Sequence, residues 1–150
     1  MVKRKKLKRG IKGQLVEGRI LKQVTEKNPK AWVHRFKQYK FSLGQPADLM
    51  MLAKGFAALM EVKATKIDHI AKGNIRKKQI KDLKRFQRLS KYHYGVLIFY
   101  YSKKRKYVIV SIRKIKQLKG NITYEKAIAL GVEVKSWRKI KYYVKKSDKR

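Results

Sequence analysis

The sequence contains no cysteine, and only nine of its 150 residues are acidic. The absence of cysteine excludes disulfide bonds, zinc–thiolate sites and a cysteine nucleophile. No apolar run reaches the roughly 18 residues of a membrane span, and the basic N-terminus is not followed by the apolar segment of a signal peptide. We therefore expect no membrane partner and a cytoplasmic location, in the host cytoplasm if the gene is viral.

Basic residues are as abundant as acidic residues are scarce. Lysine and arginine number 43, and the formal net charge is +34. Self-repulsion at this charge density destabilises a compact chain unless an anionic partner binds it, and nucleic acid is the leading candidate. With 43% hydrophobic residues, the chain can still bury the core of one domain. We expect a folded domain over residues 10–137, between a basic arm at 1–9 and a basic tail at 138–150.

Hydrophobic periodicity predicts alternating helices and strands. Helices are expected where apolar residues recur at helical spacing, at 10–27, 74–90 and 123–130. Strands are expected as two pairs joined by short turns and one edge strand, at 48–52 with 56–63, 96–101 with 107–112, and 132–137. This order predicts an α/β fold in which helices pack against a sheet.

Two acidic residues fall where paired strands bring them together. Asp48 begins the first strand of the first pair, and Glu61 lies near the end of the second strand. Because the turn between them reverses the chain, the start of one strand lies beside the end of the other. Lys63 follows Glu61 by two residues and therefore points to the same face of the sheet. The sequence thus predicts a carboxylate pair with an adjacent amine.

Such a pair suits hydrolysis of a phosphodiester. Mg²⁺ takes oxygen ligands and keeps several waters, and it both neutralises phosphate charge and activates water. We expect Asp48, Glu61 and the backbone carbonyl of Val62 to hold Mg²⁺, with Mn²⁺ as a substitute. Lys63 is expected to orient the attacking water and to offset charge on the phosphate. No small-molecule cofactor is expected.

The residues Pro46-Ala47-Asp48 and, thirteen positions after Asp48, Glu61-Val62-Lys63 resemble the signature of PD-(D/E)xK nucleases, with one extra residue between proline and aspartate. The resemblance extends over residues 10–112, through a glutamate on the first helix, the strand pair, a glutamine on the second helix and an apolar strand opened by Gly95. This order resembles the archaeal Holliday junction resolvases and the RecU-type resolvases. It implies a restriction-endonuclease-like mixed β-sheet flanked by helices. It also implies a homodimeric, Mg²⁺-dependent enzyme that resolves four-way DNA junctions by paired symmetric nicks.

The resemblance assigns roles to three further residues. By position, Glu17 is an accessory metal ligand and Gln79 borders the catalytic site. On the residues alone, a surface acid paired with a lysine one turn away is nearly as well supported for Glu17 as the metal role, although Glu17 borders the inward stripe of its helix. Ser42 resembles the serine that precedes the aspartate in archaeal resolvases. RecU-type sequences have a histidine where this chain has Lys78, so the choice of subfamily stays open.

DNA contacts are expected where cations cluster. Four lie at the tip of the second strand pair and four lie in the N-terminal arm: Lys103, Lys104, Arg105 and Lys106, and Lys3, Arg4, Lys5 and Lys6. For the arm, a disordered tail is at least as good an interpretation. Aromatic and basic residues also interleave from Trp32 to Phe41, where stacking on DNA and packing in the core or a dimer interface are equally supported.

Two other functions are compatible with the same residues. A PD-(D/E)xK nuclease can act on duplex, flap or single-stranded DNA, and the sequence does not separate these substrates. A non-catalytic basic nucleic-acid-binding protein would have a similar composition. Metal-dependent hydrolysis distinguishes the nucleases from this last class.

Overall fold

The computed structural model describes residues 2–36 and 46–149, and the side chains of residues 13–36 and 46–149. Its largest element is a six-stranded mixed sheet with the order β1-β2-β3-β5-β6-β8. The strands β3 and β5 are parallel, and the other neighbours in this sheet are antiparallel. The predicted fold class, an α/β fold with a mixed sheet flanked by helices, is confirmed.

The elements follow one another in an order close to the predicted one. The strands of the large sheet are β1 (Trp32–Arg35), β2 (Leu49–Ala53), β3 (Phe56–Thr65), β5 (His93–Tyr101), β6 (Lys106–Ser111) and β8 (Val132–Glu133). A two-stranded sheet pairs β4 (His69–Ala71) with β7 (Asn121–Thr123). The helices are α1 (Val2–Lys27), α2 (Lys77–Arg88), α3 (Tyr124–Leu130) and α4 (Ile140–Lys149). Short 3₁₀ turns are η1 (Lys72–Asn74), η2 (Ile112–Gln117) and η3 (Trp137–Lys139). None of the described helices is long and apolar enough to cross a membrane.

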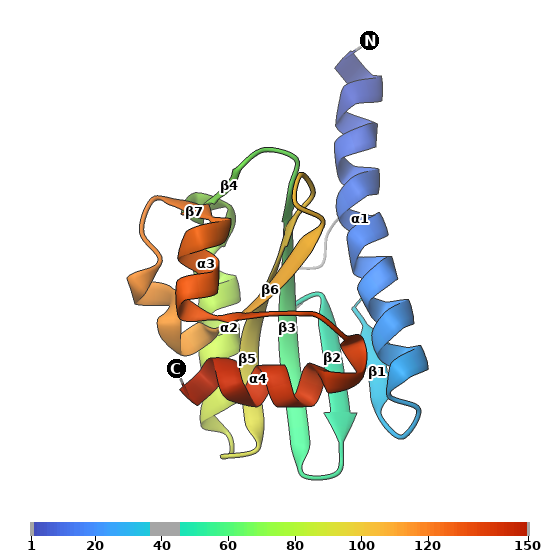
Figure 1. Cartoon of the computed structure of the whole chain (residues 1–150), viewed down its shortest axis with the longest axis vertical. Helices are drawn as coiled ribbons and strands as arrows, with labels where there is room; N and C mark the ends of the chain where they lie inside the picture. The colour runs from blue at the N-terminus through green and yellow to red at the C-terminus, as the bar shows by residue number, and fades with distance from the viewer. Residues whose placement is uncertain (1, 37–45, 150) are drawn as a thin grey trace.

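Helices cover both faces of the large sheet. Val16 of α1 and Val144 of α4 share one hydrophobic core with inward residues of the strands. Leu83 of α2 and Ala127 of α3 belong to the core on the opposite face. Figure 1 shows α4 lying across the strands, and α1 running beside β1 and extending beyond the sheet toward the N-terminus. The sheet is therefore the middle layer of a three-layer domain.

Both predicted strand pairs are present. The turn between β2 and β3 includes Gly55, whose φ of 66° lies in the left-handed region that glycine adopts readily. At the start of β5, a Cβ on Gly95 would collide with the carbonyl oxygen of Leu83, so glycine lets α2 approach the sheet closely. The apolar strand opened by Gly95 is β5, which is central in the sheet and largely buried. Glycine is thus required at the tight β2–β3 turn and at the close contact between β5 and α2.

The two ends of the chain differ from the prediction. Helix α1 begins at Val2, so the backbone of the predicted arm is helical. The predicted basic tail contains α4, in which Ile140, Tyr143, Val144 and Ser147 are buried. These four positions have the helical spacing i, i+3, i+4 and i+7, which creates an apolar stripe within a basic segment. The C-terminal segment is thus part of the folded domain.

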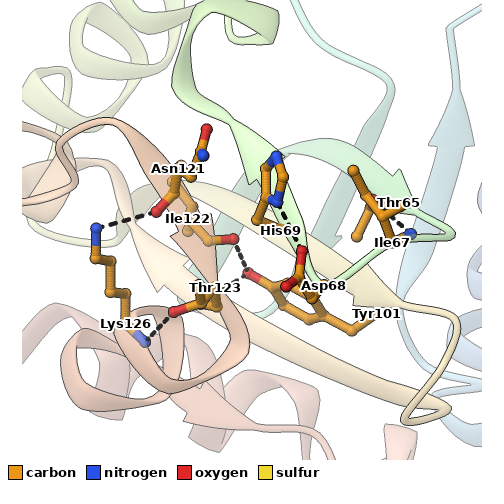
Figure 2. Close-up of polar contacts among 9 residues, drawn as sticks. All are labelled: Thr65, Ile67, Asp68, His69, Tyr101, Asn121, Ile122, Thr123 and Lys126. Atoms are coloured by element: carbon orange, nitrogen blue, oxygen red, sulfur yellow. Dashed lines mark hydrogen bonds and ion pairs between the residues drawn. The ribbon is translucent and has the colours of Figure 1, made fainter.

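The small sheet is attached to β5 through a buried tyrosine. The hydroxyl of Tyr101 lies 3.0 Å from the carbonyl oxygen of Ile122 and 3.2 Å from that of Thr123, as Figure 2 shows. Lys126 of α3 also contacts β7, since its Nζ donates to the carbonyl of Asn121 at 3.1 Å. These bonds hold β7 and the start of α3 beside the end of β5, next to the β5–β6 turn.

Candidate functional site

The pairing of β2 with β3 brings Asp48 beside Glu61. Leu49 faces Met60 in the antiparallel register, and the backbone N–H of Asp48 donates to the carbonyl of Met60 at 3.1 Å. Asp48 is 5% exposed and Glu61 is 2% exposed. The structure therefore forms the buried carboxylate pair that the hairpin predicted.

The peptide between Glu61 and Lys63 also contacts this pair. The backbone N–H of Val62 donates a 2.8 Å hydrogen bond to Oδ2 of Asp48. In a strand, the N–H and the C=O of one residue point to the same side. The carbonyl of Val62 consequently faces the side on which Asp48 lies, where the sequence placed a backbone ligand.

Gln79 and Lys63 both contact the same oxygen of Glu61. Gln79 Nε2 donates to Glu61 Oε1 at 2.6 Å, and Lys63 Nζ lies 3.3 Å from the same oxygen. The other oxygen, Oε2, is buried and has no hydrogen-bond partner among the described residues. A buried carboxylate oxygen without a donor is costly. This oxygen is available to a cation.

Gln79 has two roles in the structure. Its side-chain Oε1 accepts a 3.0 Å hydrogen bond from the backbone N–H of Arg76, which caps the N-terminus of α2. Its Nε2 reaches Glu61. Because the cap fixes the amide, its NH₂ group is held toward the carboxylate. The structure thus places Gln79 at the site border, as the resemblance implied.

The electrostatics of the pair favour a proton on Glu61 when no cation is present. Burial, and next the charge of Asp48, raise the pKa of Glu61 to about 8, against the opposing effect of Lys63. Two close carboxylates in a poorly solvated site cannot both be ionised cheaply. A divalent cation relieves both causes at once, because it replaces the lost hydration and separates the like charges.

Glu17 reaches the site from α1 and is held by Arg35. Glu17 is 8% exposed, and its Oε2 lies 3.1 Å from Nη2 of Arg35 in β1. Burial, and next the charge of Asp48, raise the pKa of Glu17, whereas Arg35 lowers it. Sequence reasoning did not single out Arg35. No local pattern indicates it, because the contact joins elements 18 residues apart.

The distribution of acids supports this site independently. All nine acidic residues lie in the described part of the chain. Three of them are buried, and they are the three selected from the sequence: Glu17, Asp48 and Glu61. A chain of net charge +34 has many lysines with which acids can pair at the surface, so the burial of these three points to a specific task.

The residues present are suited to a Mg²⁺-type cation. Two carboxylates and a backbone carbonyl are hard oxygen donors, and Mg²⁺ in proteins commonly binds through one or two carboxylates plus water and phosphate. The partnerless Glu61 Oε2 provides a ready ligand atom. Within residues 13–36 and 46–149, no group of three or more histidine, cysteine, aspartate or glutamate side chains is placed to hold a metal. Direct ligation by Glu17 therefore stays a prediction.

The remaining predicted residues lie apart from the carboxylate pair. Ser42 falls outside the described residues, and so do the side chains of Lys3, Arg4, Lys5 and Lys6, whose backbone belongs to α1. The other four cations surround the β5–β6 turn: Lys103, Lys104, Arg105 and Lys106. Two of these contact acids, since Lys104 lies 3.6 Å from Glu125 and Lys106 lies 2.8 Å from Glu133. Among the described residues, no carboxylate lies within ion-pair distance of Lys103 or Arg105, although the charge of Lys103 contributes to lowering the pKa of the exposed Asp68. The charges of Lys103 and Arg105 are therefore available to a ligand.

Comparisons with known proteins support the fold. No family model matches the sequence, and no curated protein matches it either. Among solved structures, the chain is similar to Hjc of Archaeoglobus fulgidus, a Holliday junction resolvase from an archaeal hyperthermophile. The TM-score is 0.64 with 11% sequence identity, over 86% of this chain and 99% of that chain. The chain therefore has the fold of an archaeal Holliday junction resolvase, as the sequence resemblance predicted.

Proposed function

We propose that the chain is a Mg²⁺-dependent endonuclease that resolves four-way DNA junctions. The observation that carries this proposal is the buried pair Asp48 and Glu61 with Lys63 on the same strand as Glu61. The fold shared with an archaeal resolvase supports the choice of substrate. The net charge of +34 supports DNA as the partner, because phosphate contacts by lysine and arginine supply most of the affinity of such proteins.

The chain's own residues prepare the site for a cation and for phosphate. We propose Asp48, Glu61 and the Val62 carbonyl as ligands, with Glu17 as an accessory ligand. When bound, Mg²⁺ would supply charge neutralisation at the phosphate and activation of water. Because the pKa of Glu61 is about 8, its proton competes with the cation at neutral pH. Gln79 keeps Glu61 Oε1 in place through its 2.6 Å hydrogen bond, so loading need not reorganise the carboxylate.

Lys63 acts on the substrate side of the pair. Its ammonium group lies 3.3 Å from Glu61 Oε1, and its side chain is 21% exposed, so it can reach both the acids and an incoming phosphate. A fixed cation at this position offsets the negative charge that grows on the phosphate during cleavage and orients the attacking water. Arg35 lowers the pKa of Glu17, against burial and the charge of Asp48, which raise it.

We further propose that two chains act together. A four-way junction has two-fold symmetry, and paired symmetric nicks need two equivalent sites. An isologous homodimer presents one site per chain in that arrangement. Lys103 and Arg105 at the β5–β6 turn, and the cations along the N-terminal half of α1, would then contact phosphates of the junction arms.

A cleavage panel tests the proposal. A synthetic four-way junction, a flap, a duplex and a single strand are incubated with the protein at matched salt, in Mg²⁺, Mn²⁺ or EDTA. We expect cleavage of the junction in either metal, and none in EDTA. Asp48→Asn and Glu61→Gln should lower the rate at least about 100-fold while DNA binding is retained.

Matched variants keep this test specific. Asp82→Asn and Glu26→Gln remove surface acids of the same type and should cleave normally, since Asp82 pairs with Lys78 along α2 and Glu26 is exposed. Undiminished cleavage by either site variant would contradict the metal site. Equal cleavage of duplex or flap would replace the junction with a broader DNA substrate. Tight binding without cleavage in either metal would identify a non-catalytic DNA-binding protein.

A further inference from the structure

Three aromatic side chains form a ladder along one face of the edge strand β1. The rings of Trp32 and His34 are parallel to within 1° with centroids 5.3 Å apart, and the ring of Phe36 meets that of His34 edge-on at 5.0 Å. The alternate residue Val33 packs into the core that includes α1. The ladder therefore occupies the face of the sheet opposite to α1.

The ladder begins in solvent and ends at the carboxylate pair. Trp32 is 54% exposed, and its register partner in β2, Leu52, is 38% exposed. His34 is also exposed, whereas Phe36 packs partly against the core. At the inner end, the backbone N–H of Phe36 donates to the carbonyl of Asp48 at 2.9 Å. Four residues of strand span about 13 Å, so the exposed rings lead directly to the site.

The charge around the outer end indicates the kind of partner. Lys30 and Lys54 are exposed and lie two residues beyond Trp32 and Leu52 at the same end of the antiparallel strand pair, within a chain of net charge +34. Exposed aromatic rings beside cations are the combination by which proteins bind unpaired nucleotides, since bases stack on the rings and phosphates contact the cations. A duplex hides the faces of its bases, so the rings have no stacking partner there.

We propose that the strip formed by Trp32, His34 and Phe36 is a stacking platform for unpaired nucleotides of a DNA strand leading to Asp48. The proposal rests on the proposed function only for the choice of DNA, because the geometry of the strip stands without catalysis. A branch point interrupts the continuous stack of bases, so the faces of its bases are more accessible and the bases open more readily than within a continuous duplex. Stacking there would favour branched over linear DNA without contacts that read the base sequence.

Tryptophan fluorescence in EDTA tests the platform in the absence of cleavage. The chain has two tryptophans, and Trp137 packs edge-on against Tyr107 at 5.1 Å. Trp137→Phe therefore leaves Trp32 as the sole reporter. We expect titration with a thymidine oligonucleotide to quench the emission of Trp32, and a blunt duplex of equal length at matched salt to leave it unquenched.

Substitutions provide the second readout. Trp32→Ala should weaken binding of the single strand about tenfold, and Trp32→Phe should restore most of the affinity. Tyr142→Ala is the matched control, because Tyr142 is 58% exposed and lies on α4, which covers the other face of the sheet. It should bind the single strand like the parent protein. Thermal unfolding checks that each variant is folded.

Three outcomes overturn the proposal. One is binding of the single strand, seen by anisotropy, without quenching of Trp32. Another is equal loss of affinity in Trp32→Ala and Tyr142→Ala. The third is a Trp32 emission that shifts with protein concentration in the absence of DNA, which would make the strip a contact between two copies of the chain. None of these depends on cleavage, so a protein that binds as expected but never cuts would refute the nuclease alone.

Discussion

The backbone N–H of Val62 donates a 2.8 Å hydrogen bond to Oδ2 of Asp48, the carboxylate that lies beside Glu61. The Asp48 side chain thus has two roles, because it accepts a structural hydrogen bond and carries a negative charge. The two can be separated by substitution, because asparagine retains an oxygen acceptor and loses the charge.

We expect Asp48→Asn to fold like the parent protein and to lose at least about 100-fold in cleavage. Asp48→Ala should lose the same activity and also about 1–3 kcal/mol of unfolding free energy, because the buried N–H of Val62 loses its acceptor. Chemical denaturation and junction cleavage measure the two effects. Equal stabilities of the two variants would show that this hydrogen bond contributes little.

The raised pKa of Glu61 makes the stability of the metal-free protein depend on pH. In the folded state the pKa is about 8, against an ordinary value of 4.5. Between these values the folded chain holds a proton that the unfolded chain has released, so stability falls as pH rises. The loss is about 1.4 kcal/mol for each pH unit, or about 3–6 °C in melting temperature for a chain of this size.

Glu61→Gln isolates this effect, because the amide imitates the protonated carboxyl and does not titrate. In EDTA, melting curves from pH 5 to pH 9 should show the parent falling relative to the variant, with the difference levelling off above pH 8. Addition of Mg²⁺ should stabilise the parent most at high pH and leave the variant nearly unchanged. Parallel curves in EDTA would mean that Glu61 titrates normally.

The parts of the site that sequence could predict are those fixed by local pairing. Asp48 and Glu61 meet because a short turn joins their strands, and alternation along β3 adds Lys63. The contact between Glu17 and Arg35 joins a helix to an edge strand. No periodicity or spacing encodes such a contact. Helix phasing placed Glu17 at the border of an inward stripe and a family resemblance assigned its role, but neither indicated Arg35.

The C-terminal helix shows a different limit. Basic residues dominate the segment, and their abundance suggested a solvated tail. The apolar stripe of α4 was nevertheless present at helical spacing, with Ile140, Tyr143, Val144 and Ser147 all buried. The many basic residues of this segment masked its apolar helical periodicity, because the cations lie on the solvent face of an amphipathic helix. In a chain this basic, periodicity is the better guide to which segments fold.

Asp148 anchors the end of α4 to the rest of the domain. Its Oδ1 accepts from Gln87 Nε2 at 2.7 Å and from Ser111 Oγ at 2.9 Å, and Arg113 Nε lies 3.4 Å away. We expect Asp148→Ala to lower the unfolding free energy by about 2–3 kcal/mol, because it leaves buried donors without an acceptor. Urea denaturation measures the loss, and Glu26→Ala, an exposed acid on α1, is the control that should change little. An Asp148→Ala variant as stable as the parent would show that these contacts do not hold α4 to the rest of the domain.

The cations at the β5–β6 turn should divide into two functional pairs. Among the described residues, no carboxylate lies within ion-pair distance of Lys103 or Arg105, whereas Lys104 and Lys106 contact Glu125 and Glu133. Only the first pair has its charge available for phosphate. Replacing Lys103 and Arg105 with alanine should reduce the slope of log affinity against log salt by about two, at roughly 0.9 for each phosphate contact.

A double variant that leaves the net charge unchanged is the control for the effect of Lys103 and Arg105 on the salt slope. The double variant Lys106→Met with Glu133→Gln removes a 2.8 Å ion pair and leaves the net charge of the chain unchanged. Its salt slope for duplex DNA in EDTA should match that of the parent, because no contact to phosphate is lost. Replacing Lys103 and Arg105 with alanine also lowers the net charge of the chain. A lower net charge by itself weakens the long-range attraction of DNA but removes no fixed contact to phosphate. A slope that is unaltered by the alanine pair, with affinity reduced uniformly, would show that Lys103 and Arg105 attract DNA at a distance and do not contact its phosphates.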